Sequence, residues 1–185
     1  MNKTAIIIPS RLDALRLPNK PLKLINNKEM ILHVYEAAKK TNTGEVYVAT
    51  PDQKIIDIII SNGGKAVLTS LNHQTGTDRI YEVFKTKLKS EPNVIVNLQG
   101  DMPNIDPQAI TDLVSYMHKD QCDIGTLASS FSSESELIDE NNVKVAVKDK
   151  LATNIFQKAT DFFRAGVKNY KNFYHHVGIY AFTNK

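Results

Sequence analysis

The sequence has little of several features that mark particular classes of protein. It contains one cysteine, Cys122, and no tryptophan. A single cysteine excludes a disulfide within the chain and any metal site built from several thiolates, and it is typical of a protein of the reducing cytoplasm. The surplus of positive charge is also small, because 23 Lys and Arg stand against 20 Asp and Glu, a formal net charge of +3. We therefore expect neither a nucleic-acid partner nor binding to an acidic membrane surface.

Long apolar runs and glycine-rich phosphate loops are missing as well. The apolar runs at 5–8 and 58–60 are far shorter than the roughly 20 residues that cross a bilayer, so we expect no membrane insertion. The first run stops at Pro9, too early for a secretory signal, and we expect the mature protein to begin at Met1. Neither GxGxxG nor GxxxxGK(S/T) occurs. A phosphate site in this protein would therefore have to use side chains.

What the sequence does contain is a regular alternation of strand-like and helix-like segments. Short β-rich runs predict strands at 4–8, 46–50, 65–68 and 94–98. Apolar residues recur at helical spacing within 31–38, 80–88 and 110–117. This alternation predicts an α/β fold with a mainly parallel sheet and helices on both of its faces. With 185 residues and no linker or repeat, we expect a single domain over 1–185.

The second half of the chain has a different pattern. Val143, Val145 and Val147 alternate with Lys144, Ala146 and Lys148. A turn at 149–150 and a second strand at 152–156 would complete a β-hairpin. A further β-rich run lies at 177–182, close to the last residue.

Ligands of an open parallel sheet bind beyond the carboxyl ends of its strands. The loop after the first predicted strand carries Arg11, Arg16 and Lys20 between prolines. Three cations at such an edge could neutralise a triphosphate and the charge that develops on a departing pyrophosphate. The alternative is an ordinary solvated loop with surface cations.

The ends of two other predicted strands also carry polar groups. Gly100 and Asp101 follow the fourth strand, where a carboxylate could hold Mg²⁺ against phosphate oxygens, or could instead be a turn or capping residue. The segment 73–79 after the third strand surrounds Gly76 with polar side chains just before a helix. It suits recognition of a base or a phosphate, with capping of the helix by Thr77 as the alternative.

Together these segments resemble the 3-deoxy-manno-octulosonate (KDO) cytidylyltransferase family, which makes CMP-KDO for lipopolysaccharide biosynthesis. The matching segments are IIIPSR at 6–11, RLPNKPL at 16–22, VAT at 48–50, HQTGTDR at 73–79, VNLQGDMP at 96–103, NNVKV at 141–145 and HVGIYAF at 176–182. The resemblance covers essentially the whole chain. It implies a Rossmann-like nucleotide-diphospho-sugar transferase fold and a cytoplasmic homodimer that transfers CMP from CTP to KDO, with Mg²⁺ and release of pyrophosphate.

The resemblance also implies roles for individual residues. The nucleotide and its phosphates would be bound by Ser10, Arg11, Arg16, Lys20, Thr75, Gly76 and Arg79. The sugar acid would be held by Gln99, Arg164, His176 and Tyr180. Asp101 would bind the metal, and Arg11, Arg16, Lys20 and Asp101 would form the catalytic set. Without the resemblance, His176 and Tyr180 would be interpreted as structural residues and Arg164 as a surface arginine.

The sequence departs from the family pattern in three ways. Met102 stands where a glutamate is usual, and 156–158 has the sequence Phe-Gln-Lys in place of Phe-Ser-Arg. Family members also continue past this chain's end, and the additional part supplies a second acidic metal ligand, a glutamate that contacts KDO and closing helices. We therefore expect a chain that lacks the usual C-terminal portion. Two alternatives stay open: a cytidylyltransferase for another 2-keto sugar acid, such as a sialic acid, and a non-catalytic nucleotide-binding subunit.

Overall fold

The computed structural model describes residues 3–13, 17–119, 122–153, 155–164 and 170–184. The chain divides into two compact units, which we call unit 1 (Met1–Gly125 with Ile179–Lys185) and unit 2 (Thr126–Gly178). The single nucleotidyltransferase domain expected over 1–185 stays a prediction.

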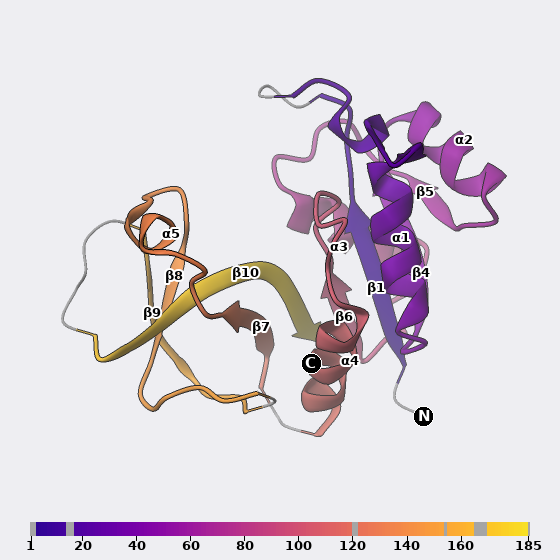
Figure 1. The fold of residues 1–185 in the computed structure, drawn as a ribbon. Coiled ribbons are helices and arrows are strands. Elements are labelled where there is room, and N and C mark those ends of the chain that lie inside the picture. The colour runs from indigo at the N-terminus through magenta and orange to yellow at the C-terminus, as the bar shows by residue number, and fades with distance from the viewer. Residues whose placement is uncertain (1–2, 14–16, 120–121, 154, 165–169, 185) are drawn as a thin grey trace. The chain divides into compact units, whose positions relative to one another are not determined.

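Unit 1 is built around a mainly parallel sheet (Figure 1). Its strand order is β5 (Ala66–Leu68), β4 (Glu45–Thr50), β1 (Thr4–Pro9), β6 (Val94–Asn97) and the end of β10 (Asn172–Thr183). β1 pairs in parallel with β4 and with β6, whereas β10 pairs antiparallel with β6. Every residue of β1 is buried, which is why its sequence is continuously apolar instead of alternating. The four strands predicted in the first half are confirmed to within one residue at each end.

Four helices cover the two faces of this sheet: α1 (Met30–Lys40), α2 (Gln53–Ser61), α3 (Gly76–Thr86) and α4 (Pro107–Lys119). α3 packs through Ile80 and Val83 on the face that carries Ile7, and α1 and α4 cover the opposite face (Figure 1). At the start of α4 the Asp106 carboxylate accepts a hydrogen bond from the Gln108 N–H at 2.9 Å. No helix within the described ranges combines the length and the apolar character needed to span a membrane.

Two short elements in unit 1 escape the sequence pattern. A 3₁₀ helix covers Lys20–Leu22, and a two-stranded hairpin joins β2 (Leu24–Ile25) to β3 (Lys28–Glu29). Asn26 and Asn27 form its turn with φ values of 49° and 63°, the left-handed conformation that asparagine tolerates best after glycine. Strands of two residues are too short to show a period.

Unit 2 is antiparallel. β8 (Lys144–Val147) lies between the first part of β10 and β9 (Ala159–Phe163), and a short helix, α5, covers Glu134–Ile138. β7 (Ile124–Ser129), which begins in unit 1, pairs with β10. The run predicted at 177–182 is confirmed as part of β10, which is longer than expected.

The hairpin expected in unit 2 is wrong in its second strand. β8 pairs with 159–163 instead of 152–156, and none of the described residues between 148 and 158 is in a strand. Side chains bond the backbone of this segment in place of a strand partner. The Gln157 amide exchanges two hydrogen bonds of 3.1 Å with the Asp149 backbone, and the Tyr174 hydroxyl accepts the Leu151 N–H at 2.8 Å. The turn at 149–150 therefore opens into a longer loop.

Candidate functional site

A polar cleft of about 180 Å³ lies in unit 1, where the ends of β1 and β6 face the start of α3. Its lining residues are Pro9, Ser10, Arg11, His73, Gln74, Thr75, Gly76, Arg79 and Gln99. Six of them, all but Pro9, His73 and Gln74, are site residues predicted from the sequence. Three segments that are far apart in the chain thus meet at the sheet edge where open α/β folds bind their ligands.

The wall after β1 contains a buried polar group that lacks a partner. The Ser10 N–H donates to the Ala49 carbonyl at 2.9 Å, but the Ser10 hydroxyl is buried and has no hydrogen-bond partner in the described part of the chain. Leaving such a group unsatisfied costs about 1–3 kcal/mol, so a ligand that bonds to it gains that amount. The following residues are held by Asp52, whose carboxylate accepts the Leu12 N–H at 2.8 Å. Arg16 lies outside the described residues.

The cleft also contains a buried cation. Arg79 is 3% exposed, and its Nη1 donates to the Thr69 hydroxyl and, at 2.9 Å, to the Ser70 carbonyl. Burial lowers the pKa of Arg79, and the positive charge of Arg11 lowers it further. A guanidinium stays charged despite such a shift. Two mutually repelling cations in one polar cleft favour an anionic ligand.

The start of α3 is closed by a reciprocal cap. The Thr75 hydroxyl accepts the Asp78 N–H at 3.1 Å, and the Asp78 carboxylate accepts the Thr75 N–H at 3.0 Å. The Thr75 hydroxyl also donates to the Asp78 carboxylate at 2.7 Å, and this bond, together with the one from the Thr75 N–H, lowers the pKa of Asp78. The helix is therefore capped by Thr75, and the alternative that named Thr77 is wrong. Gly76 allows the close approach, because a Cβ there would lie 3.1 Å from the Pro9 ring.

Lys20 and Asp101 form an ion pair, with 2.7 Å between Nζ and Oδ2. Asp101 is two residues beyond Gln99 in the cleft, and its neighbour Gly100 packs so closely that a Cβ there would lie 3.0 Å from the Pro9 carbonyl oxygen. The two side chains are 38% and 50% exposed, so solvent and ligands can reach the pair. The sequence predicts both residues but not their contact.

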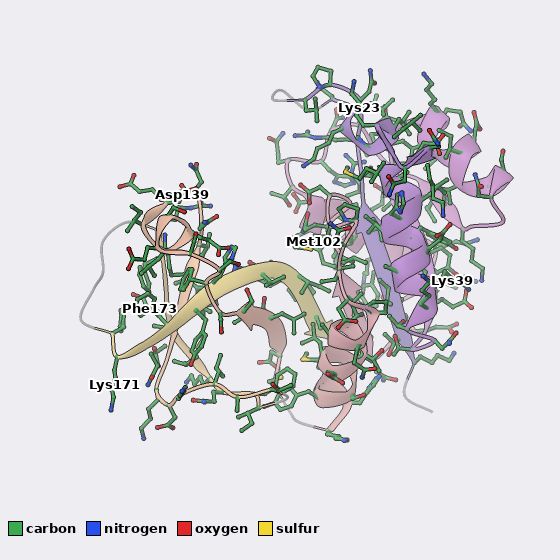
Figure 2. All side chains as sticks on the ribbon, in the orientation of Figure 1. Lys23, Lys39, Met102, Asp139, Lys171 and Phe173 are labelled. Atoms are coloured by element: carbon green, nitrogen blue, oxygen red, sulfur yellow. The ribbon has the colours of Figure 1, made fainter. Side chains whose placement is uncertain are left out.

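The donor set near Asp101 fits one mode of magnesium binding. Among the described residues, no group of three or more His, Cys, Asp or Glu is arranged to hold a metal ion. Met102, on the loop between β6 and α4 (Figure 2), adds a thioether instead of an oxygen ligand. A single carboxylate suits Mg²⁺ when phosphate oxygens and water supply the other ligands, which is how this ion commonly binds with nucleotides.

The four residues predicted to hold the sugar acid fall into both units. In unit 1, Gln99 lines the cleft and donates to the Asn97 side chain at 3.2 Å, and Tyr180 stands opposite Asn97 in the β10–β6 ladder. In unit 2, Arg164 donates through Nη1 to the Asn141 carbonyl at 2.8 Å. Sugar binding by all four residues stays a prediction.

The surroundings of His176 are also those of a histidine with a structural role. It is 8% exposed, its Nε2 lies 2.9 Å from the Thr126 hydroxyl, and Phe162 meets its ring edge-on at 5.2 Å. Burial lowers the pKa of His176, and the neighbouring His175 lowers it further. The ring is therefore neutral near pH 7 and serves as a hydrogen-bonding group instead of a cation.

Sequence reasoning missed one residue that shapes the cleft. Glu82, one turn after Asp78 on α3, accepts the Ser70 N–H at 3.0 Å and is hydrogen-bonded to His73, a lining residue. Asp78, Arg79 and Glu82 are separated by the spacing that places side chains on one helix face. This spacing could have identified Glu82 from the sequence, because all three side chains bond to the segment that precedes the helix.

Comparison with known proteins yields one family and several relatives. The profile of a family described as cytidylyltransferase matches residues 5–185. An 8-amino-3,8-dideoxy-manno-octulosonate cytidylyltransferase of Shewanella pealeana is 40% identical over 188 residues, which cover 100% of this chain and 76% of that protein. A 3-deoxy-manno-octulosonate cytidylyltransferase of Brucella ovis is 38% identical over 182 residues, 97% of this chain and 72% of that protein.

A solved structure also resembles this chain over nearly its full length. It is that of CMP:2-keto-3-deoxy-manno-octonic acid synthetase complexed with CTP. The match has a TM-score of 0.87 and 37% sequence identity, and it covers 99% of this chain and 75% of that one.

Proposed function

Because this chain belongs to the cytidylyltransferase family, we propose that it transfers CMP from CTP to KDO or a close analogue, and releases pyrophosphate. The observation that carries the proposal is the cleft, which combines an unpartnered Ser10 hydroxyl with the charges of Arg11 and Arg79. It lies at the sheet edge beside the Lys20–Asp101 pair. The CTP-bound relative with a TM-score of 0.87 supports the nucleotide assignment.

In the proposed reaction the anomeric hydroxyl of the sugar attacks the α-phosphorus of CTP, and the bond to pyrophosphate breaks. The protein has two tasks in such a step: positioning the reactants and stabilising the charge of the leaving group. Arg11 is exposed and can donate directly to phosphate oxygens. Arg79, whose Nη1 already bonds to Thr69 and Ser70, contributes a fixed positive field within the cleft. No covalent intermediate on the protein is required.

Lys20 and Asp101 would separate when substrate binds. The ammonium group would move to the phosphates, and the carboxylate would hold Mg²⁺, the metal that we propose. When bound, this ion would draw negative charge from the phosphate oxygens. The partial exposure of both side chains supports such an exchange, because breaking an exposed ion pair costs at most about 1 kcal/mol.

Two sugar acids are candidates for the acceptor. The relative from Brucella ovis is named for KDO, and the relative from Shewanella pealeana, which is 40% identical, is named for its 8-amino-8-deoxy analogue. The two sugars share the carboxylate and the anomeric hydroxyl and differ at carbon 8. If this protein activates a 2-keto sugar acid other than KDO, the 8-amino sugar is therefore the first candidate.

The decisive experiment measures pyrophosphate release and CMP-sugar formation from CTP and Mg²⁺ with each sugar acid in turn. We expect turnover with at least one of the two, and the larger kcat/KM identifies the acceptor. Tight binding of CTP without pyrophosphate release in either reaction would instead support the non-catalytic nucleotide-binding subunit.

Variants of the ion pair test the proposed roles within the same assay. Asp101→Asn and Lys20→Met should each lower kcat/KM by about 100-fold or more, because charge stabilisation at the phosphates is the main task of the protein. Lys28→Met is the matched control. Lys28 pairs with Glu36 at 2.8 Å with similar exposure, and neither residue has a proposed role at the phosphates, so the loss of Lys28 should change kcat/KM less than twofold. Unchanged kinetics in the Asp101 variant would contradict its role.

We further propose that the protein is a cytoplasmic homodimer and that 1–185 forms one nucleotidyltransferase domain. The family resemblance supports the dimer, and the single cysteine supports the cytoplasm. Sedimentation equilibrium would distinguish a dimer from the 20.7 kDa monomer.

A further inference from the structure

We infer that Glu82 is a positioning residue for nucleotide binding, acting through His73 and the Ser70 backbone. The inference rests on the proposed function, in which the cleft binds CTP. Glu82 itself is not among the residues that line the cleft. Its effect on the nucleotide is therefore indirect, and the groups to which it bonds are the contacts that can transmit it.

The segment 69–75 is held almost entirely by side chains of α3. Arg79 donates to the Ser70 carbonyl at 2.9 Å, and Asp78 accepts the Thr75 N–H at 3.0 Å. Glu82 bonds both the Ser70 N–H, at 3.0 Å, and the His73 ring. This segment has no strand or helix of its own in the structure. Its shape, and with it one wall of the cleft, therefore depends on a few polar contacts.

One oxygen of Glu82 makes both of its contacts. Oε2 accepts the Ser70 N–H and also meets Nε2 of His73. These two groups are three residues apart, so a single carboxylate ties the beginning of the loop to its lining residue. The contact also fixes which nitrogen of the ring carries a proton. The hydrogen bond to His73 lowers the pKa of Glu82, so the carboxylate is ionised near pH 7 and can only accept, which places the proton on Nε2.

This arrangement keeps a negative charge beside an anion site without exposing that charge to the anion. The Glu82 carboxylate is engaged by His73 and lies in the field of Arg79. Nδ1 is then the ring nitrogen of His73 that remains to contact a ligand, as an acceptor in the neutral ring or as a donor in the protonated one. Loss of Glu82 would release the ring to other rotamers and free both nitrogens to exchange the proton.

The test is a double-mutant cycle read out as the Kd of CTP, measured by isothermal titration with the full chain. Glu82→Ala should weaken CTP binding by about tenfold or more. Glu82→Gln keeps a neutral acceptor and should weaken binding by about threefold, since hydrogen bonds to charged groups are roughly twice as strong. In a His73→Ala background both losses should become clearly smaller, because only the contact of Glu82 with the Ser70 N–H then remains.

A matched control is available in unit 2. Glu136 also accepts a serine N–H, at 2.6 Å from Ser132, and pairs with a histidine, at 2.7 Å from His175. Glu136→Ala removes the same kind of contact from residues that do not line the cleft and should leave the Kd of CTP within twofold of the unmodified chain.

The possible outcomes separate this inference from the proposed function. If the unmodified chain binds CTP and the Glu82 variants bind it equally well, the inference is wrong and the proposed function stands. If the Glu82 losses are the same with and without His73, Glu82 acts on the fold in general and the inference is also wrong. Failure of the unmodified chain to bind CTP would overturn the proposed function itself. Should Glu82→Ala fail to fold, the Glu82→Gln cycle gives the same decision.

Discussion

The two units of this protein are stabilised in different ways. Unit 1 buries complete aliphatic side chains, including Ile7, Ile31 and Ile59, none of which exposes any surface. In unit 2, the buried apolar residues among those described are only Val145, Ala146, Val147 and Phe163. Burial of aliphatic side chains stabilises a fold in proportion to the apolar area removed from water, whatever the orientation of the groups. The contacts of unit 2, in contrast, mainly depend on the orientation of the groups that make them. A small antiparallel unit can thus be specified by particular side chains where little apolar surface is available.

A glutamate contact that both units share makes the comparison sharper. Glu82 in unit 1 and Glu136 in unit 2 each accept a serine N–H and pair with a histidine ring. In unit 1 the histidine lines the cleft, whereas in unit 2 His175 stacks on Phe131 with ring centroids 6.0 Å apart. The same arrangement therefore orders a loop that borders the cleft in one unit and supports an aromatic cluster in the other.

The largest expected effect comes from removing aliphatic volume in unit 1. Ile7→Ala should lower the free energy of unfolding by about 2–5 kcal/mol, because the cavity left in a filled core cannot collapse completely. Ile138→Ala in unit 2 should change it by less than about 0.5 kcal/mol, since Ile138 is 74% exposed. Urea unfolding followed by circular dichroism measures both. Equal losses would contradict the division between an aliphatic and a directional unit.

An intermediate effect is expected from the buried lysine of unit 2. Lys144 is 2% exposed, and its ammonium donates to the carbonyls of Asp139 at 2.6 Å and Arg164 at 2.9 Å. Lys144→Met keeps the volume but deprives both carbonyls of their donor, which should cost about 1–3 kcal/mol.

Hydrogen exchange can show where that loss occurs. Faster exchange should be confined to β8 and β9, with β1 and β4 unaffected. The same replacement at Lys28, an exposed residue of unit 1, should leave exchange unchanged throughout. Uniformly faster exchange in the Lys144 variant would show that the directional contacts of unit 2 also stabilise unit 1.

The smallest effect concerns pH. Burial lowers the pKa of His176 in unit 2 and of His118 in unit 1 below the ordinary histidine value of 6.5. The unfolded chain then binds more protons than the folded one, so stability that is fully present above pH 6.5 is lost as the pH falls below it. The pKa values of Glu82 and Glu136 are lowered from 4.5, so their contribution is lost only at more acidic pH.

Replacing either histidine should flatten this dependence. The midpoint of thermal unfolding, measured between pH 7.5 and pH 5, should fall less steeply in His176→Gln and in His118→Gln than in the unmodified chain. The midpoint of the variant that carries both replacements should fall least. Curves that run parallel to that of the unmodified chain would show that the two rings titrate normally.

Most of unit 1 follows from local sequence patterns. The strands and the helices α1, α3 and α4 have strong apolar signals, since each element must bury one face or two. The position of the cleft also follows, because the ends of parallel strands converge on one edge. Six predicted residues, Ser10, Arg11, Thr75, Gly76, Arg79 and Gln99, consequently meet there.

The errors occur where nonlocal polar contacts decide the structure. β8 pairs with 159–163 because Gln157 and Tyr174 satisfy the backbone of the intervening loop. The contact of Glu82 with His73 was likewise missed, since it depends on how the loop folds back on α3. No local period reports such a bond.

By itself the sequence determined the α/β class, the order of elements in the first half, the family resemblance and the types of residue available for chemistry. These features can be predicted from the spacing of apolar residues over short stretches and from contiguous motifs. The tertiary structure alone decided which polar side chains meet: Lys20 with Asp101 across 81 positions, Glu82 with His73, and Lys144 with the carbonyls of two loops. An apolar side chain is buried whenever apolar residues recur with the period of the strand or helix that carries them. A hydrogen bond needs two atoms within about 3 Å of each other, and only the folded chain sets that distance.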